Sequence, residues 1–436
     1  MAAPNGFYSP ATVTPRKPAL GFIFVTLVLD VLGIGLIVPI LPKLVKFFEA
    51  GDTSAAANTS GLLMALYAMM QFLCAPLLGS LSDRFGRRPV ILASLLGSGL
   101  DYFLLALAPN LGWFFAGRVI AGVTGANYSA ATAYIADISP PEKRAANFGM
   151  IGAAFGLGFI LGPALGGVLQ AVGTSAVNAE FGLRLPFIVA GVLTLVNWLY
   201  GLLVLPESLV PENRRDFSWA RAYPVGALLD LRRHPVVIGL AATYFLVSLA
   251  HQAFPATWVL YTENRFGWTS IQTGLSLALV GLTAALVQGG LTRVVIPRLG
   301  ERKAVVVGLS ISAMAFVAYG LANHGWMFYA LIVVGSLGGI SNPAVQGLIS
   351  RSVGANEQGG VQGSLAGLQS VAGFLGIQLS SRLFGYFIRP EAPVQLPGAA
   401  FFGGAILMAF GLALAIRSFR KDRLATEASP RGNDSV

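Results

Sequence analysis

Twelve long apolar runs constrain the fold of this chain more than any other feature of its sequence. A transmembrane α-helix needs about 20 consecutive, mostly apolar residues, whereas a transmembrane β-strand is about half as long and alternates in polarity. The runs are of the helical kind and predict an all-α integral membrane protein with twelve transmembrane helices. They lie at approximately residues 19–42, 61–81, 89–108, 111–135, 147–171, 185–205, 236–260, 269–292, 303–322, 325–349, 361–387 and 398–417.

Composition excludes an ordinary soluble protein. Hydrophobic residues make up 55% of the chain and charged residues 11%, and the mean hydropathy is +0.70. Soluble domains are about 25% charged. The first run has no small-residue cleavage site and is too long for the apolar core of a signal peptide, so we expect it to remain as a helix.

The placement of basic side chains predicts the orientation. Most of the 29 Lys and Arg residues lie in the two tails and in one set of alternate loops. Loops rich in Lys and Arg stay in the cytoplasm, so both termini are expected there, in a cell inner membrane. This topology and attraction to anionic membrane lipid explain the net charge of +10, which therefore does not indicate a nucleic-acid partner.

The two halves of the chain resemble each other weakly. GSLSDRFGRRPV at 79–90 recurs in weakened form as RVVIPRLGERKAV at 293–305. In membrane proteins, repeats of this kind are typical of transporters whose substrate site lies between the repeats and opens to each side in turn. We expect a cytoplasmic tail at 1–18, a six-helix half at 19–205, a cytoplasmic linker rich in proline and charge at 206–235, a second six-helix half at 236–417 and a cytoplasmic tail at 418–436.

Several motifs carry a family resemblance. The loop at 79–88 resembles the signature cytoplasmic loop of the major facilitator superfamily, and GFILGPALGG at 158–167 resembles the fifth-helix motif of its drug/proton antiporters. LDVLGIGLIVPILP, GLDYFLLALAP and WVLYTENRFGW are similar to segments of the tetracycline efflux group. The resemblance implies the major facilitator fold of two six-helix repeats, and proton-driven drug export by alternating access.

The loop after the second run is a candidate conformational latch. Gly86 permits a tight turn, and Asp83 can accept hydrogen bonds from a helix N-terminus or from a neighbouring arginine. Anchoring at the cytoplasmic lipid surface would explain the arginines but neither the aspartate nor the glycines. The resemblance implies that the loop holds the two halves together in one conformation. The expected latch residues are Gly79, Asp83, Arg84, Gly86, Arg87 and Arg88.

The fifth run contains a stripe of small residues. Glycines four residues apart let two helices approach closely, and a proline removes one backbone hydrogen bond. Packing alone could explain the stripe. The alternative is that this closely packed, bent helix seals the transport path against proton leak. The motif consists of Gly158, Gly162, Pro163, Gly166 and Gly167.

Three charged residues within the runs are candidates for proton coupling: Asp30, Asp101 and Arg118. An ionisable group in the middle of a membrane helix costs roughly 2.5–3.5 kcal/mol, so it is usually functional. A carboxyl group in a dry pocket can gain and lose a proton near neutral pH as access alternates. A static ion pair between Asp30 and Arg118 is the structural alternative.

The candidate substrate residues are mostly neutral. His251 could contact substrate, relay protons or only join two helices. Tetracycline exporters place a histidine in span eight and an acid in span nine, where this chain has Ala284 and Ser312. This departure places tetracycline as the substrate in doubt and favours neutral or weakly basic amphiphiles. The expected substrate residues are Gln71, Asn127, His251, Gln252, Gln288, Ser312 and Asn342.

The sequence thus predicts a proton-coupled exporter of small amphiphilic drugs that works as a monomer and is not an enzyme. A metabolite importer or uniporter of the same fold, and a sensor or channel that transports nothing, are the alternatives. The chain has no G-x-x-x-x-G-K-[ST] motif for ATP and no metal-ligand spacing, so no cofactor is expected.

Overall fold

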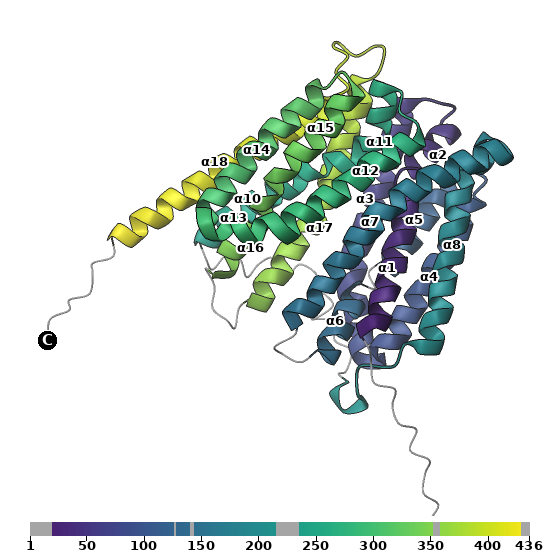
Figure 1. Cartoon of the computed structure of the whole chain (residues 1–436), viewed down its shortest axis with the longest axis horizontal. Helices are drawn as coiled ribbons and strands as arrows, with labels where there is room; N and C mark the ends of the chain where they lie inside the picture. Colours follow the sequence, from purple (N-terminus) through teal and green to yellow (C-terminus); the bar gives the residue numbers. More distant parts are fainter. Residues whose placement is uncertain (1–19, 126–127, 140–143, 215–234, 352–357, 429–436) are drawn as a thin grey trace, which may run out of the picture.

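The computed structural model describes residues 20–125, 128–139, 144–214, 235–351 and 358–428 (Figure 1). All regular structure in these ranges is helical, which confirms the all-α prediction. The predicted tail at 1–18 lies outside the described residues, as does most of the predicted linker. The last helix continues past the predicted end at 417, because its polar, basic C-terminal turns are compatible with helix beyond the apolar run.

The helices of the first part of the chain (the N-terminal helices) include three that are longer than their apolar runs, α3, α7 and α8. One of them, α3, begins after Asp52, whose carboxylate accepts the backbone N–H groups of Ser54 at 2.8 Å and Ala55 at 3.1 Å. The helices are α1 (Leu20–Ile37), α2 (Leu41–Phe48), α3 (Thr53–Phe85), α4 (Arg87–Ala106), α5 (Leu111–Gly125), α6 (Tyr128–Ile138), α7 (Arg144–Ala176) and α8 (Ala179–Val204).

The helices of the second part (the C-terminal helices) are more often interrupted. They follow the short η2 (Pro211–Asn213) and are α10 (Pro235–His251), α11 (Ala253–Phe266), α12 (Ser270–Leu286), the π-helix η4 (Val287–Leu291), α13 (Thr292–Leu299), α14 (Glu301–Leu321), α15 (Gly325–Ser336), the 3-10 helix η5 (Leu337–Ile340), α16 (Ser341–Arg351), α17 (Gln358–Phe387) and α18 (Ala399–Ala428).

Each predicted apolar run coincides with helix. By length and hydropathy, eight helical segments of the described part could cross a membrane. The other four runs correspond to α5 with α6, α10 with α11, α12 with η4, and α17, which are shorter, interrupted or more polar. The structure therefore shows a multi-span helical membrane protein, and the count of twelve spans stays a prediction.

The repeated loop motif at 79–90 and 293–305 has the same local structure in both copies. Gly86, with a φ of +108°, separates α3 from α4, and its counterpart Gly300, with a φ of +78°, separates α13 from α14. Positive φ at these angles is accessible to glycine and strained for other residues. Both copies of the loop motif thus use a glycine to end one helix and begin the next.

Two helix pairs make most of the contact between the N-terminal helices and the C-terminal ones: α7 packs against α12, and α3 packs against α17 (Figure 1). Smaller contacts join α11 to α2 and α3. Along α3 the packing changes with position. Near its start, Gly61 lies directly against Ser381 of α17, whereas no residue from Leu66 to Gly79 is buried. The two sets of helices are therefore closed against each other at the α2 end and separate toward the Gly86 end.

Candidate transport site

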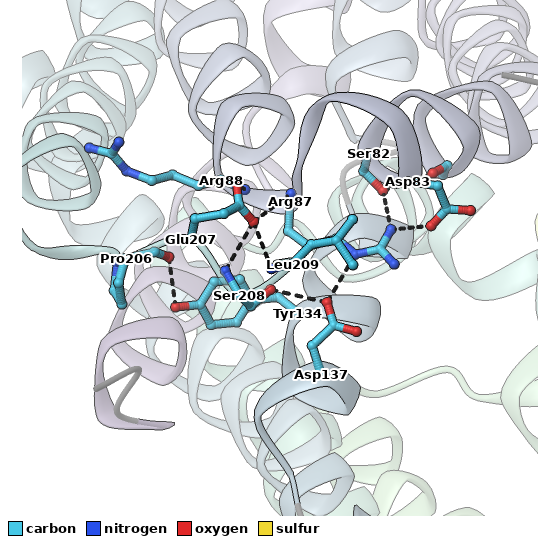
Figure 2. A network of polar contacts seen from close by, with 11 residues as sticks. Ser82, Asp83, Arg87, Arg88, Tyr134, Asp137, Pro206, Glu207, Ser208 and Leu209 are labelled. Carbon is cyan, nitrogen blue, oxygen red and sulfur yellow. Dashed lines mark hydrogen bonds and ion pairs between the residues drawn. The ribbon is translucent and has the colours of Figure 1, made fainter. Parts of the chain in front are cut away.

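A network of polar contacts lies at the Gly86 end (Figure 2). Arg87 is only 8% exposed and is the centre of this network. Its guanidinium donates hydrogen bonds to Ser82 at 2.7 Å, to Asp83, and to the carboxylate of Asp137 on α6 at 3.1 Å. Arg87 therefore fastens the start of α4 to α3 and α6 rather than anchoring the loop in lipid.

Glu207, just after α8, caps the N-terminus of α4. Its carboxylate accepts the backbone N–H of Arg87 at 2.9 Å and that of Arg88 at 3.2 Å, together with the N–H groups of Ser208 and Leu209 (Figure 2). A negative charge is stabilised at the positive end of a helix. A side chain at Gly86 would overlap the Glu207 carboxylate, so this turn requires glycine for space as well as for φ.

Sequence reasoning identified only part of this network. It allowed Asp83 to accept bonds from either a helix N-terminus or an arginine, and the structure shows the arginine. Arg84 is exposed, with its guanidinium 5.3 Å from the ring centroid of Phe85. A latch between the two halves stays a prediction, because the contacts described for this network join the N-terminal helices to one another. The residues that sequence reasoning missed are Ser82, Tyr134, Asp137, Glu207 and Ser208.

Glu207→Gln is expected to weaken this junction. An amide has one acceptor oxygen, so its NH2 group would face backbone N–H donors, and the charge at the helix N-terminus is lost. The cost should be about 1–3 kcal/mol, seen as a lower melting temperature of the purified protein and reduced transport. Glu212→Gln, an exposed position in the same segment, is the matched control. Equal melting temperatures for the two variants would refute the capping role.

The small-residue stripe of α7 packs on two sides. A Cβ added at Gly162 would lie 2.6 Å from the Cα of Gly35 on α1, and Gly158 faces Val31 in the same way. On another face of α7, Gly167 contacts the backbone of Ser270 on α12. The motif also brings Gly166 against Leu36 of α1 and Pro163 against Gly274 of α12.

Gly162→Ala is expected to destabilise the protein by about 1–3 kcal/mol, because the added methyl meets backbone that cannot move aside. Gly156→Ala on the same helix is the matched control, since a Cβ there meets nothing within 4 Å and alanine favours helix. Thermal unfolding of both variants in the same detergent measures the difference. A melting temperature for Gly162→Ala at or above that of Gly156→Ala would contradict the close-packing argument.

Two of the predicted proton-coupling residues form a buried ion pair. Asp101 on α4 is 2% exposed, and its carboxylate lies 3.7 Å from the guanidinium of Arg118 on α5. Neither Asp101 oxygen has a hydrogen-bond partner in the described part of the chain, and the Arg118 Nε has none there either. Among the described residues, the attraction of Arg118 is therefore the only polar contact of the Asp101 carboxylate. A proton can replace this attraction without breaking a hydrogen bond between the carboxylate and a described residue.

Tyrosines, which sequence reasoning missed, surround this pair. The guanidinium of Arg118 lies 6.0 Å from the ring centroid of Tyr67 on α3. Gln71, one turn along α3, donates to the Tyr67 hydroxyl at 3.3 Å and to the Gly125 carbonyl at 3.2 Å. The Asp30 carboxylate on α1 lies within electrostatic range of Tyr67 and Tyr102. Four of the predicted residues, Asp30, Gln71, Asp101 and Arg118, thus lie around one pair of tyrosines.

The predicted substrate residues of the C-terminal helices do not form one group. His251 and Gln252 lie at the break between α10 and α11. Gln288 is exposed on η4, and Asn342 on α16 accepts a hydrogen bond from Gln346 at 3.1 Å. Ser312 is 5% exposed and packs against Gly338 of η5, so it does not line an open surface in this state. Asn127 lies outside the described residues.

Within the described ranges, no three His, Cys, Asp or Glu side chains are placed to hold a metal ion.

Charged contacts close the α2 end. The ammonium group of Lys46 on α2 lies 2.7 Å from the Glu263 carboxylate on α11, and that of Lys43 donates to Ser270 on α12 at 2.9 Å and lies 3.8 Å from Glu263. These contacts join the N-terminal helices to the C-terminal ones. Sequence reasoning counted both lysines only among the few basic residues on the membrane face opposite the one rich in Lys and Arg.

Comparison with known proteins places these features in context. The family model of the Major Facilitator Superfamily matches residues 23–377. The chain is 42% identical to the class C tetracycline resistance protein of Escherichia coli over 82% of this chain and 87% of that protein. It is 38% identical to the class G protein of Vibrio anguillarum, over 80% and 86%. A bacterial homologue of the human lysosomal transporter Spinster is similar in fold, with a TM-score of 0.72, 16% identity, and coverage of 92% and 97%.

Proposed function

Because the chain belongs to the Major Facilitator Superfamily of membrane transporters, we propose that it is a proton-coupled exporter of small amphiphilic drugs in the bacterial inner membrane, with both termini in the cytoplasm. The buried pair of Asp101 and Arg118 carries the proposal, since a carboxylate in a membrane helix that has no hydrogen bond to the described residues is suited to exchanging protons. The tetracycline resistance proteins to which the chain is similar support drug efflux.

In this proposal the α2 end faces outward and is closed in the state described, so substrate enters from the cytoplasm. Arg118 stabilises the negatively charged carboxylate of Asp101, so Asp101 releases its proton. In the state open to the cytoplasm, the proton leaves to the cytoplasm. After the helices rearrange, the opened outer side releases the drug and lets Asp101 take up a proton, which permits the return step. The side chains of Asp30, Tyr67 and Tyr102 surround the pair and influence how well its charges are stabilised. Each cycle thereby exchanges an outer proton for an inner drug molecule.

The substrate is proposed to be neutral or weakly basic. At the positions corresponding to the family's histidine and acid, this chain has Ala284 and the buried Ser312. A cationic metal chelate would lose the attraction of a nearby acid, worth about 4 kcal/mol for a close pair at an effective dielectric constant of 20. Tetracycline itself is the second candidate, which the similarity to tetracycline resistance proteins favours.

Purified protein in liposomes with an imposed pH gradient tests both candidates. We expect uphill movement of a neutral phenicol such as chloramphenicol that stops when an ionophore dissipates the gradient, and weak movement of tetracycline with magnesium. Gradient-dependent tetracycline transport as fast as that of the phenicol would reject the charge argument. Transport of both compounds that only equilibrates them, with or without the gradient, would favour a uniporter instead.

A further inference from the structure

A polar stripe runs along α10 into α11. Tyr244, Ser248, His251 and Pro255 share one helix face by their spacing. Ser248 and His251 are partly exposed and Pro255 is exposed. The Tyr244 hydroxyl donates a hydrogen bond at 3.1 Å to the exposed Gln369 of α17. Tyr244 is itself only 4% exposed. Ionisable and amide side chains are costly against lipid, so the partly exposed Ser248 and His251 point to a polar interior rather than to the bilayer.

A contact with a backbone carbonyl determines which nitrogen of the His251 ring carries the proton. The Nδ1 atom of His251 lies 2.8 Å from the carbonyl oxygen of Val247. A carbonyl oxygen can only accept a hydrogen bond, so Nδ1 carries the proton. In the neutral imidazole the other nitrogen, Nε2, then has a free lone pair and acts as an acceptor.

The Nε2 atom of His251 is not fully enclosed by the protein. It makes no hydrogen bond with the described residues, and it is not among the fully enclosed polar atoms that lack a partner. A buried nitrogen without a partner costs free energy, whereas an accessible one can be satisfied by water or by a ligand. His251 therefore presents one unused acceptor on the polar stripe.

Aromatic rings flank this acceptor. The His251 ring centroid lies 6.3 Å from that of Phe254, and 6.0 Å from that of Phe316 on α14 with the rings at 83°. Pro255, four residues after His251, has no N–H to continue the helical hydrogen bonds, so α10 ends at His251 and α11 begins at Ala253. The break therefore sets a hydrogen-bond acceptor beside the partly exposed ring of Phe254.

We propose that His251 is a specificity-determining residue that accepts a hydrogen bond at Nε2 from an O–H or N–H donor on a flat aromatic substrate. The inference rests on the proposed export function and narrows its substrate class to aromatic amphiphiles that carry a donor. Phe254, which is partly exposed, contacts the ring system, and Nε2 orients it; the buried Phe316 supports Phe254, with the two ring centroids 4.9 Å apart. An analogue of the same shape without the donor leaves Nε2 unsatisfied and binds less tightly.

Equilibrium binding to the full-length protein in nanodiscs tests this assignment. The probes are 2-naphthol, which has an O–H donor, and 2-methoxynaphthalene, which has the same ring system without it. Empty nanodiscs give the background of partition into lipid. We expect the wild-type protein to bind 2-naphthol about tenfold more tightly. His251→Phe should bind the two probes equally, whereas His251→Gln, whose amide oxygen can accept a hydrogen bond, should retain a preference for 2-naphthol.

His324→Phe is the matched control, because His324 is exposed and bonded to Asn323, and it should keep the wild-type ratio. Each ratio compares two probes on the same protein, so differences in yield cancel. Equal binding of the probes by wild type, or an unchanged preference in His251→Phe, would overturn the assignment. Neither result depends on the pH gradient, so the exporter proposal succeeds or fails separately in the liposome assay.

Discussion

Asp101→Asn is expected to abolish uphill export while leaving drug exchange across the membrane near the wild-type rate. Asparagine keeps the shape of the side chain but cannot exchange a proton, and it leaves Arg118 without the carboxylate that lies 3.7 Å away. We expect gradient-driven export in liposomes to fall by roughly 100-fold, the scale on which positioned proton-transfer groups act. Counterflow of labelled drug, which needs no net proton movement, measures the exchange that remains.

Glu180→Gln is the matched control for this experiment. Glu180 is an acid of the same N-terminal helices, but it is exposed and pairs with Arg184 one turn along α8 at 2.9 Å. Its replacement should leave both uphill export and counterflow unchanged. If Asp101→Asn still pumps drug against its gradient, Asp101 does not carry the proton. Loss of export and counterflow together would instead indicate a damaged fold.

The helical architecture could be predicted because a bilayer imposes a simple rule on sequence. Apolar length alone located helix in each of the twelve predicted runs, and Gly86 could be assigned to a turn from its residue type. The interruptions were not predicted. The run at 236–260 reads as one span, but α10 ends at His251 because Pro255 lacks the N–H that would continue the helix. Hydropathy measures the cost of contact with lipid, and it is insensitive to a missing backbone bond.

The site was predictable where a residue is unusual for its surroundings. Asp101 and Arg118 stand out among apolar neighbours, and the structure brings them together. Glu207 and Glu263 do not stand out, since each lies in a polar segment of the sequence. Their roles depend on partners far along the chain: Glu207 caps a helix 120 residues earlier, and Glu263 meets Lys46 across 217 residues. Only the tertiary fold specifies such pairs.

Reversing one charge at the α2 end is the second change with a large expected effect. Glu263→Lys would place three ammonium groups together where Lys43 and Lys46 now share one carboxylate. Repulsion between close charges is about 4 kcal/mol at an effective dielectric constant of 20, before screening by salt. The closed arrangement of this end is then disfavoured, and we expect export to fall by about 10- to 100-fold, with partial recovery at high salt.

A second substitution decides whether the pair or the single residue matters. Lys46→Glu added to Glu263→Lys restores an attractive pair across the same 2.7 Å contact, so export should return toward the wild-type rate. A double-mutant cycle of transport rates gives the coupling between the two positions. Glu391→Lys adds the same charge at an exposed position of the same end and should have little effect. No rescue in the double variant would show that Glu263 acts alone. A fully active Glu263→Lys would show that closure of this end does not need the ion pairs, and that the helix contacts of α3 with α17 and of α7 with α12 are sufficient to close it.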